Sequence, residues 1–411
     1  MKKKVIALIL VFNMFFYSGC WSRSEIEDLA LVTAIGIDEM ILNGEEMPKM
    51  SLLIIRPSQL GVQSASVSKD VNPEWLVSDV GSTLYDAMRK IYDRSPRNLK
   101  FYHNQMIIIG EKSARSGLDD VFDFFQRQKD IRPQTWIFIC RGEAAEVMKS
   151  LPEFESTLSK EVSEMITNSI TNTSDTFPVD LLRLSKRILV PGWDSVLPVI
   201  RIISPREVKG SKREEKEADK TVMLEGVGVF QKGRLVGFMG VEETTGFLYL
   251  ADRIQRSIIT FKHKAESGRE FNISAIISNS SSKTTPVFKD GRLMIEVEIK
   301  ANADIVEVQS KVDIGDSQQD LPLSKPETIK HLNSDLNQKI KLMAQKSLDI
   351  AQKKYKADIY AFGRIVHQKY PDYWKKVERD WYEIYPEMPI NIKVDARIRS
   401  TSGIADPFEL K

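Results

Sequence analysis

Short apolar segments of two different periods alternate along the first third of the chain, and this alternation constrains the fold more than any other feature. Four segments are nearly unbroken apolar runs of strand length. The two segments between them repeat their apolar residues every three or four positions, which is the period of a helix. Helices in such an order pack on a sheet, so the first half is predicted to be an α/β layer. The predicted strands are Leu29–Asp38, Lys49–Arg56, Gln105–Gly110 and Thr135–Arg141, and the predicted helices are about Ser78–Asp93 and Ser116–Lys129.

The rest of the chain changes from helices to alternating strands. Residues 143–203 are mainly helical and end in a strand, whereas a hairpin is predicted across residues 223–239. In Arg292–Val308, apolar and charged residues alternate with period two, which leaves one face of the strand exposed. Such a half-exposed sheet is usually antiparallel, so an antiparallel sheet is predicted for the second half, with a last alternating strand at Ile390–Arg399.

A long helix is predicted over residues 325–357. Ser324 suits its N-cap, Pro326 suits its first turn, and Glu327 has the spacing of a capping box. Apolar residues recur along it at intervals of three and four and form one stripe: Ile329, Leu332, Leu336, Ile340, Met343 and Ile350. A stripe of this kind is expected to pack on the sheet of its own domain rather than to bind a partner.

The segment 205–220 differs from both halves of the chain by its high content of charged residues. It holds 11 charged residues out of 16 and no aromatic residue, so it cannot bury enough apolar surface to offset its ordering entropy. An exposed linker or loop is predicted here, with a docking patch as an alternative that the mixed signs disfavour. The predicted fold class is therefore α+β and multidomain, with mixed or antiparallel sheets flanked by helices. The expected parts are an N-terminal α/β region over 20–204, in which 143–203 could form a second lobe, and a C-terminal α+β domain over 221–411.

Residues 1–19 have the composition of a lipoprotein signal peptide. Lys2, Lys3 and Lys4 form a basic start, and Val5–Tyr17 is an apolar stretch of 13 residues. As a helix it would span about 20 Å, short of the roughly 30 Å hydrocarbon core of a bilayer. Ser18-Gly19-Cys20 then resembles the lipobox of bacterial lipoproteins, in which the cysteine receives a diacylglyceryl group and becomes the first mature residue. Tyr17 departs from the lipobox, which prefers an aliphatic residue at that position.

Three alternatives to a lipid-anchored Cys20 stay open: an uncleaved signal anchor, conventional cleavage that leaves a free Cys20, and a disulfide to Cys140. Cys140 is the only other cysteine, and it ends an apolar run with strand character, so it is predicted to be a buried core residue. An exported chain without a disulfide framework must be held by packing alone. Two acyl chains on Cys20 would hold the protein firmly on a membrane.

Charge and motifs argue against several classes of function. The only charges before Cys20 are the three lysines, so the formal net charge of +2 becomes −1 from Cys20 onward, which disfavours nucleic acid as a partner. The sequence has no phosphate loop, nucleophile elbow, Cys-x-x-Cys or His-Glu-x-x-His motif. The four histidines are scattered without metal-ligand spacing: His103, His263, His331 and His367. No catalytic residue, metal site or cofactor is therefore predicted, although residues far apart in the sequence can still form a site.

Two segments carry a family resemblance. The predicted mature start resembles the opening of the C subunits of spore germinant receptors, the Ger(x)C lipoproteins of endospore-forming bacteria, at Cys20, Trp21, Glu25, Gly36 and Asp38. The chain near its other end resembles the closing motif of the same family, at Asp358, Phe362, Gly363, Pro371, Trp374 and Trp381. By themselves such residues are mostly structural signals, because Gly and Asp commonly serve turns and tryptophans seven apart share one face of a helix. Apart from Cys20, a structural or interface role is expected for them.

The resemblance implies a receptor of two integral membrane subunits and this lipid-anchored one, on the outer face of the spore inner membrane, where nutrients trigger germination. It also implies three domains in a fold with little likeness to known enzymes, and it leaves direct nutrient binding unknown. A non-enzymatic subunit is therefore expected. One alternative is a solute-binding lipoprotein that delivers a small molecule to a membrane permease. Such proteins usually close two similar lobes around a cleft, whereas the halves here differ in sheet type and show no repeat. An envelope hydrolase is a further alternative.

Overall fold

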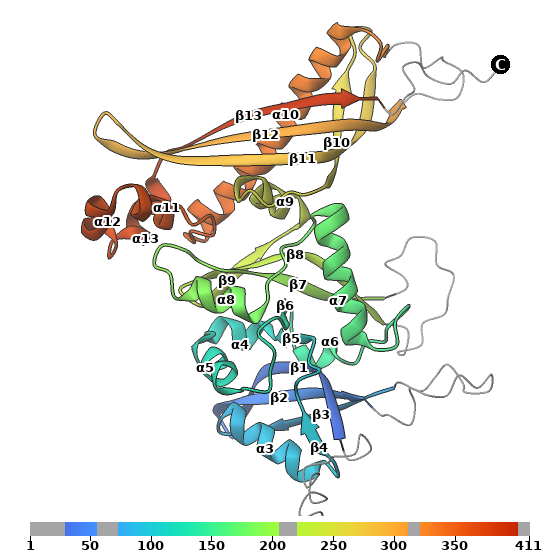
Figure 1. The fold of residues 1–411 in the computed structure, drawn as a ribbon, viewed down its shortest axis with the longest axis vertical. Coiled ribbons are helices and arrows are strands. Elements are labelled where there is room, and N and C mark those ends of the chain that lie inside the picture. Colours follow the sequence, from blue (N-terminus) through green and yellow to red (C-terminus); the bar gives the residue numbers. More distant parts are fainter. Residues whose placement is uncertain (1–28, 56–72, 205–219, 311–320, 402–411) are drawn as a thin grey trace, which may run out of the picture.

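Two β-sheets organise the computed structural model, which describes residues 29–55, 73–204, 220–310 and 321–401. The larger sheet has nine strands in the order β3-β2-β1-β5-β6-β7-β8-β9, with β4 paired to β1, and the smaller has four in the order β10-β11-β12-β13. Figure 1 shows the strands of the larger sheet following one another along the long axis of the molecule. The smaller sheet lies at the other end with the long helix α10 against it.

The centre of the larger sheet is parallel and its two edges are antiparallel. The parallel strands are β1 (Leu29–Leu42), β5 (Met106–Ile109), β6 (Trp136–Cys140) and β7 (Val196–Ile203), joined by the short β4 (Asn98–Lys100). All four residues of β5 are buried, as expected for a strand covered on both faces. The edge strands are β2 (Glu45–Ile55) and β3 (Glu74–Val80) on one side and β8 (Thr221–Gln231) and β9 (Arg234–Met239) on the other. The strands and the hairpin predicted for this region are confirmed.

Helices cover both faces of the larger sheet. On one face, the apolar sides of α6 (Ala144–Val147) and α7 (Leu158–Asn168) pack on β5 and β6. Cys140 is fully buried in this layer, which confirms its predicted place in the core. The opposite face carries the other helices of the first half: α3 (Leu84–Arg94), α4 (Glu111–Ser116), α5 (Asp119–Arg127) and α8 (Leu181–Ile188), with the π-helical turn η2 (Ser169–Thr173) between α7 and α8.

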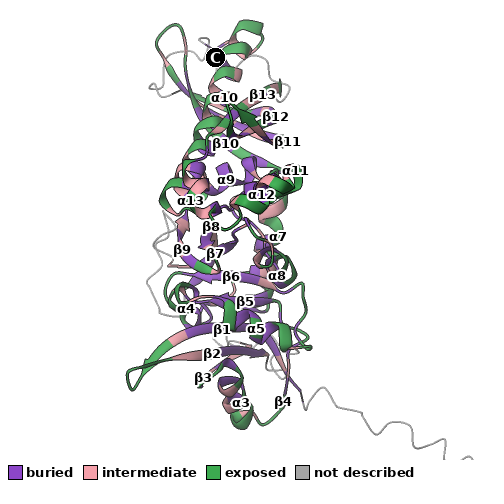
Figure 2. Ribbon diagram, turned by 90° about the vertical axis from the view of Figure 1, so that its left-hand side faces the viewer, coloured by how far each residue is buried: buried purple, intermediate pink, exposed green. Residues whose placement is uncertain are grey.

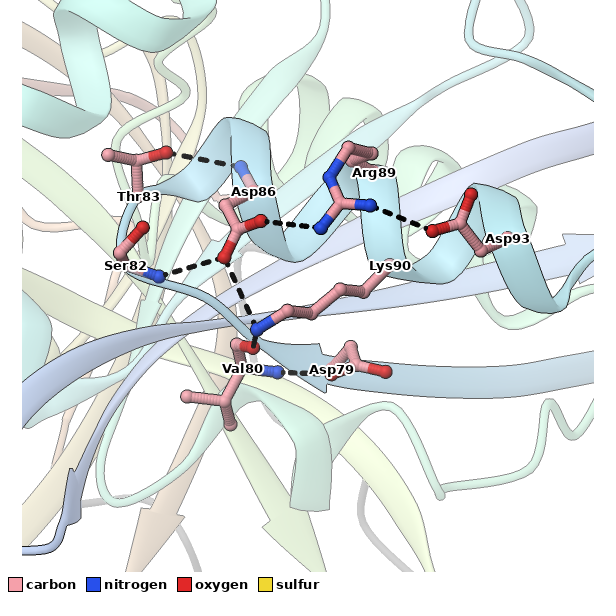
Figure 3. Close-up of polar contacts among 8 residues, drawn as sticks. All are labelled: Asp79, Val80, Ser82, Thr83, Asp86, Arg89, Lys90 and Asp93. Atoms are coloured by element: carbon pink, nitrogen blue, oxygen red, sulfur yellow. Dashed lines mark hydrogen bonds and ion pairs between the residues drawn. The ribbon is translucent and has the colours of Figure 1, made fainter.

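Hydrogen bonds to the side chains of Thr83 and Asp86 fix the start of α3 (Figure 3). Thr83 is the N-cap, and its hydroxyl accepts a hydrogen bond from the Asp86 backbone N–H at 3.1 Å. The Asp86 carboxylate accepts the Ser82 N–H at 3.1 Å and pairs with Arg89 at 3.0 Å. Hydrogen bonds from Ser82 and Arg89 lower the pKa of Asp86, so the carboxylate is ionised at the positive end of the helix dipole.

The smaller sheet is half-buried and mixed. Its strands are β10 (Ser257–Lys264), β11 (Glu270–Lys289), β12 (Arg292–Ser310) and β13 (Ile390–Ser400). The first three pair antiparallel as predicted, whereas β13 pairs in parallel with β12. Alternate residues of β10 are buried, and the buried face is covered by α10 (Pro326–Leu348) and α9 (Val241–Leu250). The apolar stripe of α10 packs on its own sheet, as the sequence predicted, through Leu332, Leu336, Ile340 and Met343.

One hydrophobic core runs from the larger sheet into the smaller one. It includes Phe230 of β8, Phe247 of α9 and Ile340 of α10, so the two sheets pack through α9 rather than across a polar gap. Figure 2 shows the same continuity, with buried residues following the axis and exposed residues on the outer sides of the helices.

Three predicted boundaries differ from the structure. Residues 78–80 belong to β3 rather than to a helix, because they pair with β2 and the Ser78 and Ser51 hydroxyls hydrogen-bond at 2.8 Å. The N-cap of α10 is Lys325 rather than Ser324, and no side chain caps the helix. This helix continues beyond Leu348 as the π-helical turn η5 (Asp349–Lys354). Trp374 and Trp381, whose spacing of seven would place them on one face of a single helix, lie in two helices, α12 (Pro371–Val377) and α13 (Trp381–Ile384).

The two sheets are not separated at the charged segment. Residues 205–219 lie outside the described residues, but β8 and β9, which follow them in the chain, belong to the larger sheet. The first half and the hairpin therefore share one sheet, and the domain boundaries proposed from the sequence stay a prediction. None of the helices in the described ranges is long and apolar enough to cross a membrane.

Candidate functional site

The residues of the predicted motifs lie partly inside and partly outside the described structure. Lys2, Lys3, Lys4, Ser18, Gly19, Cys20, Trp21 and Glu25 are outside the described residues, so their roles stay predictions. The remaining motif residues fall into two clusters. Gly36 and Asp38 lie in β1, and the residues from Asp358 to Trp381 lie around α11 (Phe362–Lys369), α12 and α13.

Asp38 ties the end of β1 to the start of α6. Its buried carboxylate accepts the backbone N–H groups of Ala144 and Ala145 at 2.6 and 3.0 Å. Burial raises the pKa of Asp38, and these two hydrogen bonds oppose the rise. Gly36 leaves room for the same helix, because a Cβ there would come within 2.5 Å of the Met148 sulfur. These contacts connect β1 to α6.

Asp358 is the centre of the second cluster and is fully buried. One carboxylate oxygen accepts the Phe362 N–H at 3.0 Å, and the other accepts the Gly363 N–H at 2.7 Å, so Asp358 caps the first turn of α11. The second oxygen also accepts the indole Nε1–H of Trp381 at 3.0 Å. Burial raises the pKa of Asp358 to about 7, against the opposing effect of these donors.

Asp194 joins this cluster from the first half of the chain, and no sequence motif indicates it. Its backbone N–H donates to the Asp358 carbonyl at 2.9 Å, and its carboxylate accepts the Asp358 N–H at 2.8 Å. The other carboxylate oxygen accepts the Lys232 N–H at 2.9 Å and the Tyr382 hydroxyl at 3.0 Å. Burial raises the pKa of Asp194 as well. Its only local signal is the turn composition of Pro191-Gly192 just before it, which does not indicate a partner 164 residues away.

The aromatic motif residues pack around this polar centre. Trp374 and Trp381 are both buried, and their rings meet edge to face with centroids 5.2 Å apart. They contact each other from two separate short helices rather than along one helical face. Phe362 is buried between Tyr360 and Tyr385, and Pro371 begins α12. Together these contacts join the loop before β7, the hairpin β8–β9 and the helices α11–α13.

Gly192 is the tightest point of this junction. Its φ is +69°, and a Cβ would lie 2.6 Å from Cη2 of Trp374 and 2.9 Å from the Gly363 Cα. Gly192→Ala is therefore expected to lower the free energy of unfolding by about 2 kcal/mol, from left-handed strain and overpacking together. Gly44→Ala is the matched control, because Gly44 has φ +87° with open space around it and should show the strain alone, about 1 kcal/mol. Equal losses in urea unfolding would mean that the contact with Trp374 does not constrain residue 192.

Neither cluster presents a reactive group to a ligand. The Asp358 and Asp194 carboxylates each accept three hydrogen bonds from their own chain, and the thiol of Cys140 is enclosed, with a pKa that burial raises far above its usual value. Of the scattered histidines, His263 pairs with Asp335 at 2.7 Å and His367 stacks on Trp374. Within the described ranges, no three His, Cys, Asp or Glu side chains are grouped to hold a metal ion. The contacts of Asp38 join β1 to α6, and those of Asp194 and Asp358 join the loop before β7 to the helices α11 and α13.

The comparison with known families decides the affiliation of the chain. A model of the spore germination protein N-terminal domain matches residues 22–202, and a model of the spore germination B3/GerAC-like C-terminal domain matches residues 225–402. The chain belongs to the GerAC-like family of spore germination proteins. The family predicted from the two terminal motifs is thereby confirmed.

Relatives and a solved structure agree with this family over the whole chain. Spore germination protein KC of Bacillus subtilis (strain 168) is 27% identical over 99% of this chain and 98% of its own length. Spore germination protein B3 of the same organism is 23% identical over 95% of this chain and 96% of its own length. The crystal structure of the GerBC protein superposes with a TM-score of 0.52 at 18% identity, over 92% of this chain and 99% of that chain. It shows the same fold and confirms the predicted α+β class.

Proposed function

We propose that this chain is the lipid-anchored, non-enzymatic subunit of a spore nutrient germinant receptor. In this proposal it acts with two integral membrane subunits on the outer face of the spore inner membrane. The observation that carries the proposal is the position of the family match, which begins at residue 22, two residues after Cys20, and continues to residue 402. The lipobox-like Ser18-Gly19-Cys20 lies directly before it, where an anchor would leave the whole family region outside the membrane.

The anchor would hold the start of β1, the third strand of the larger sheet, near the bilayer. Nine peptide steps separate Cys20 from Leu29, the first residue of β1. At most about 3.5 Å per residue, this segment reaches about 30 Å. The first residue of β1 is therefore held within about 30 Å of an acylated Cys20. A tether of this length keeps the protein at the membrane surface, where it can contact integral membrane subunits.

The lipid anchor predicts a specific effect of Cys20→Ala. Removal of the acylated thiol should release the protein from the membrane fraction and reduce nutrient germination, because two buried acyl chains provide the membrane affinity. The intact mass of the wild-type protein should correspond to a chain that begins at Cys20 plus its lipid. Cys140→Ala is the matched control, since Cys140 is enclosed in the core and its loss should leave membrane retention unchanged. Full retention and normal germination of the Cys20→Ala strain would contradict the proposed anchor.

A further inference from the structure

A pocket with an excess of positive charge lies where the two halves of the chain meet. Its volume is about 560 Å³, within the usual range of small-molecule sites. The helix α8 and the loop before β7 line one side, and the end of α9 and the start of α11 line the other. Five basic side chains reach it: Arg183, Lys186 and Arg187 from α8, Arg253 after α9, and Arg364 from α11.

Among the described residues that line the pocket, none is acidic and could balance these five cations. Asp180 lies nearby, but it is the N-cap of α8 and pairs with Arg183 at 3.3 Å. No ion pair between Lys186, Arg253 or Arg364 and an acid is present in the described part of the chain. Like charges so close together repel each other, and a bound anion would reduce this repulsion and stabilise the folded protein.

Arg187 is the buried member of the group, with only 7% of its surface exposed. Its guanidinium lies over the ring of Phe177 at 4.5 Å and over the ring of Trp193 at 5.0 Å, and Arg364 lies over the same Trp193 ring at 5.0 Å. It forms no ion pair with a described residue. Burial, together with the charges of Arg253 and Arg183, lowers the pKa of Arg187 to about 10. It is still charged at neutral pH, although a buried cation without an anion is costly.

We propose that this pocket binds a compact ligand that carries two or more anionic oxygens, as phosphate or carboxylate groups. Guanidinium groups match such oxygens with paired hydrogen bonds, and the two stacked on Trp193 are already oriented by that ring. The open mouth with its four exposed cations admits the ligand, and the buried Arg187 at the aromatic wall holds it. The inference rests on the pocket alone and does not depend on the receptor role.

The test uses the full-length protein in neutral detergent and two probes of the same chemistry. Pyrophosphate represents a free ligand, and dihexanoyl phosphatidic acid, a soluble short-chain lipid, represents a headgroup. At constant ionic strength, at least one probe should bind saturably and raise the melting temperature. Arg253→Gln and Arg364→Gln change exposed residues and should each weaken that binding about tenfold, the effect of one lost charge-assisted contact. Arg187→Met should abolish it.

Lys375→Gln is the control, because Lys375 is an exposed cation on α12 outside the pocket lining. If the wild type binds pyrophosphate and the pocket variants do not, the ligand is a free anion. If only the lipid probe binds, the ligand is a lipid headgroup. Absence of saturable binding by both probes would overturn the proposal. An equal loss in the Lys375→Gln protein would overturn it too, because it would show general charge attraction. If Arg187→Met does not fold, the two exposed variants decide the result.

Discussion

Trp381→Ala is expected to lower the free energy of unfolding by about 3 to 5 kcal/mol, the usual cost of truncating a large buried aromatic side chain. The ring is almost fully buried, contacts Trp374 edge to face, and stacks on Tyr385. Its indole N–H also donates to Asp358 at 3.0 Å, so truncation removes a donor from a buried carboxylate. Urea unfolding of the purified variant measures the loss, and Phe154→Ala, at a side chain that is 91% exposed, should be near neutral.

Two phenylalanine variants separate ring packing from the hydrogen bond. Trp381→Phe and Trp374→Phe remove the same atoms from two buried rings in contact. Of the two, Trp381 donates to Asp358, whereas the indole nitrogen of Trp374 has no hydrogen-bond partner among the described residues. Trp381→Phe should therefore cost about 1 to 3 kcal/mol more than Trp374→Phe. A Trp381→Ala protein that is stable but no longer copurifies with the proposed membrane subunits would contradict this account and place the side chain at an interface.

The pKa of Asp358 predicts that stability falls as the pH rises from about 4 to about 7. In the folded protein this pKa is about 7, above the ordinary value of 3.8 that holds in the unfolded chain. Between these values the folded state binds one more proton than the unfolded state, so the free energy of unfolding decreases with pH. The contribution of Asp358 is fully present below pH 4 and is lost through pH 7. From pH 5 to pH 7 the loss should be on the order of 2 to 3 kcal/mol.

Asp358→Asn should remove this part of the pH dependence, whatever its effect on stability at one pH. Asp123→Asn is the control, since an exposed pair with Arg127 lowers the pKa of Asp123 and keeps it ionised across the window. The measurement is the free energy of unfolding at pH 5, 6 and 7 for the three proteins. If the free energy of unfolding depends on pH in the same way for the wild type and for Asp358→Asn, Asp358 is ionised in the folded state from pH 5 to pH 7, which would contradict the prediction.

The fold was predictable wherever one local pattern determined the structure. The strands β1, β5 and β6 and the stripe of α10 carry their period in contiguous residues, and the structure confirms them. The local sequence predicts a helix at Ser78, because the strand character of this residue comes from pairing with Ser51, which no local pattern shows. The place of β8 and β9 in the larger sheet is likewise a long-range property, since β8 pairs with β7 across the charged segment.

The sequence indicated only some of the residues that form the Asp358 cluster, and it did not indicate the pocket. Asp358, Gly363 and Trp381 lie close in the sequence and were identified by a family resemblance. Their partners Asp194 and Gly192 come from a loop more than 160 residues earlier, where nothing local indicates the contact. The pocket has the same origin, because α8 supplies three of its cations and two distant segments supply the others. Charge counted along the sequence is nearly balanced and hides this local excess.

Germination of spores that lack this gene tests the central claim most directly. The spores are exposed to a panel of single nutrients and to a non-nutrient trigger, with a complemented strain as control. The receptor proposal predicts that the response to at least one nutrient class is lost while the non-nutrient trigger still works. Normal responses to every nutrient, in a strain that also lacks the other members of this family, would contradict it.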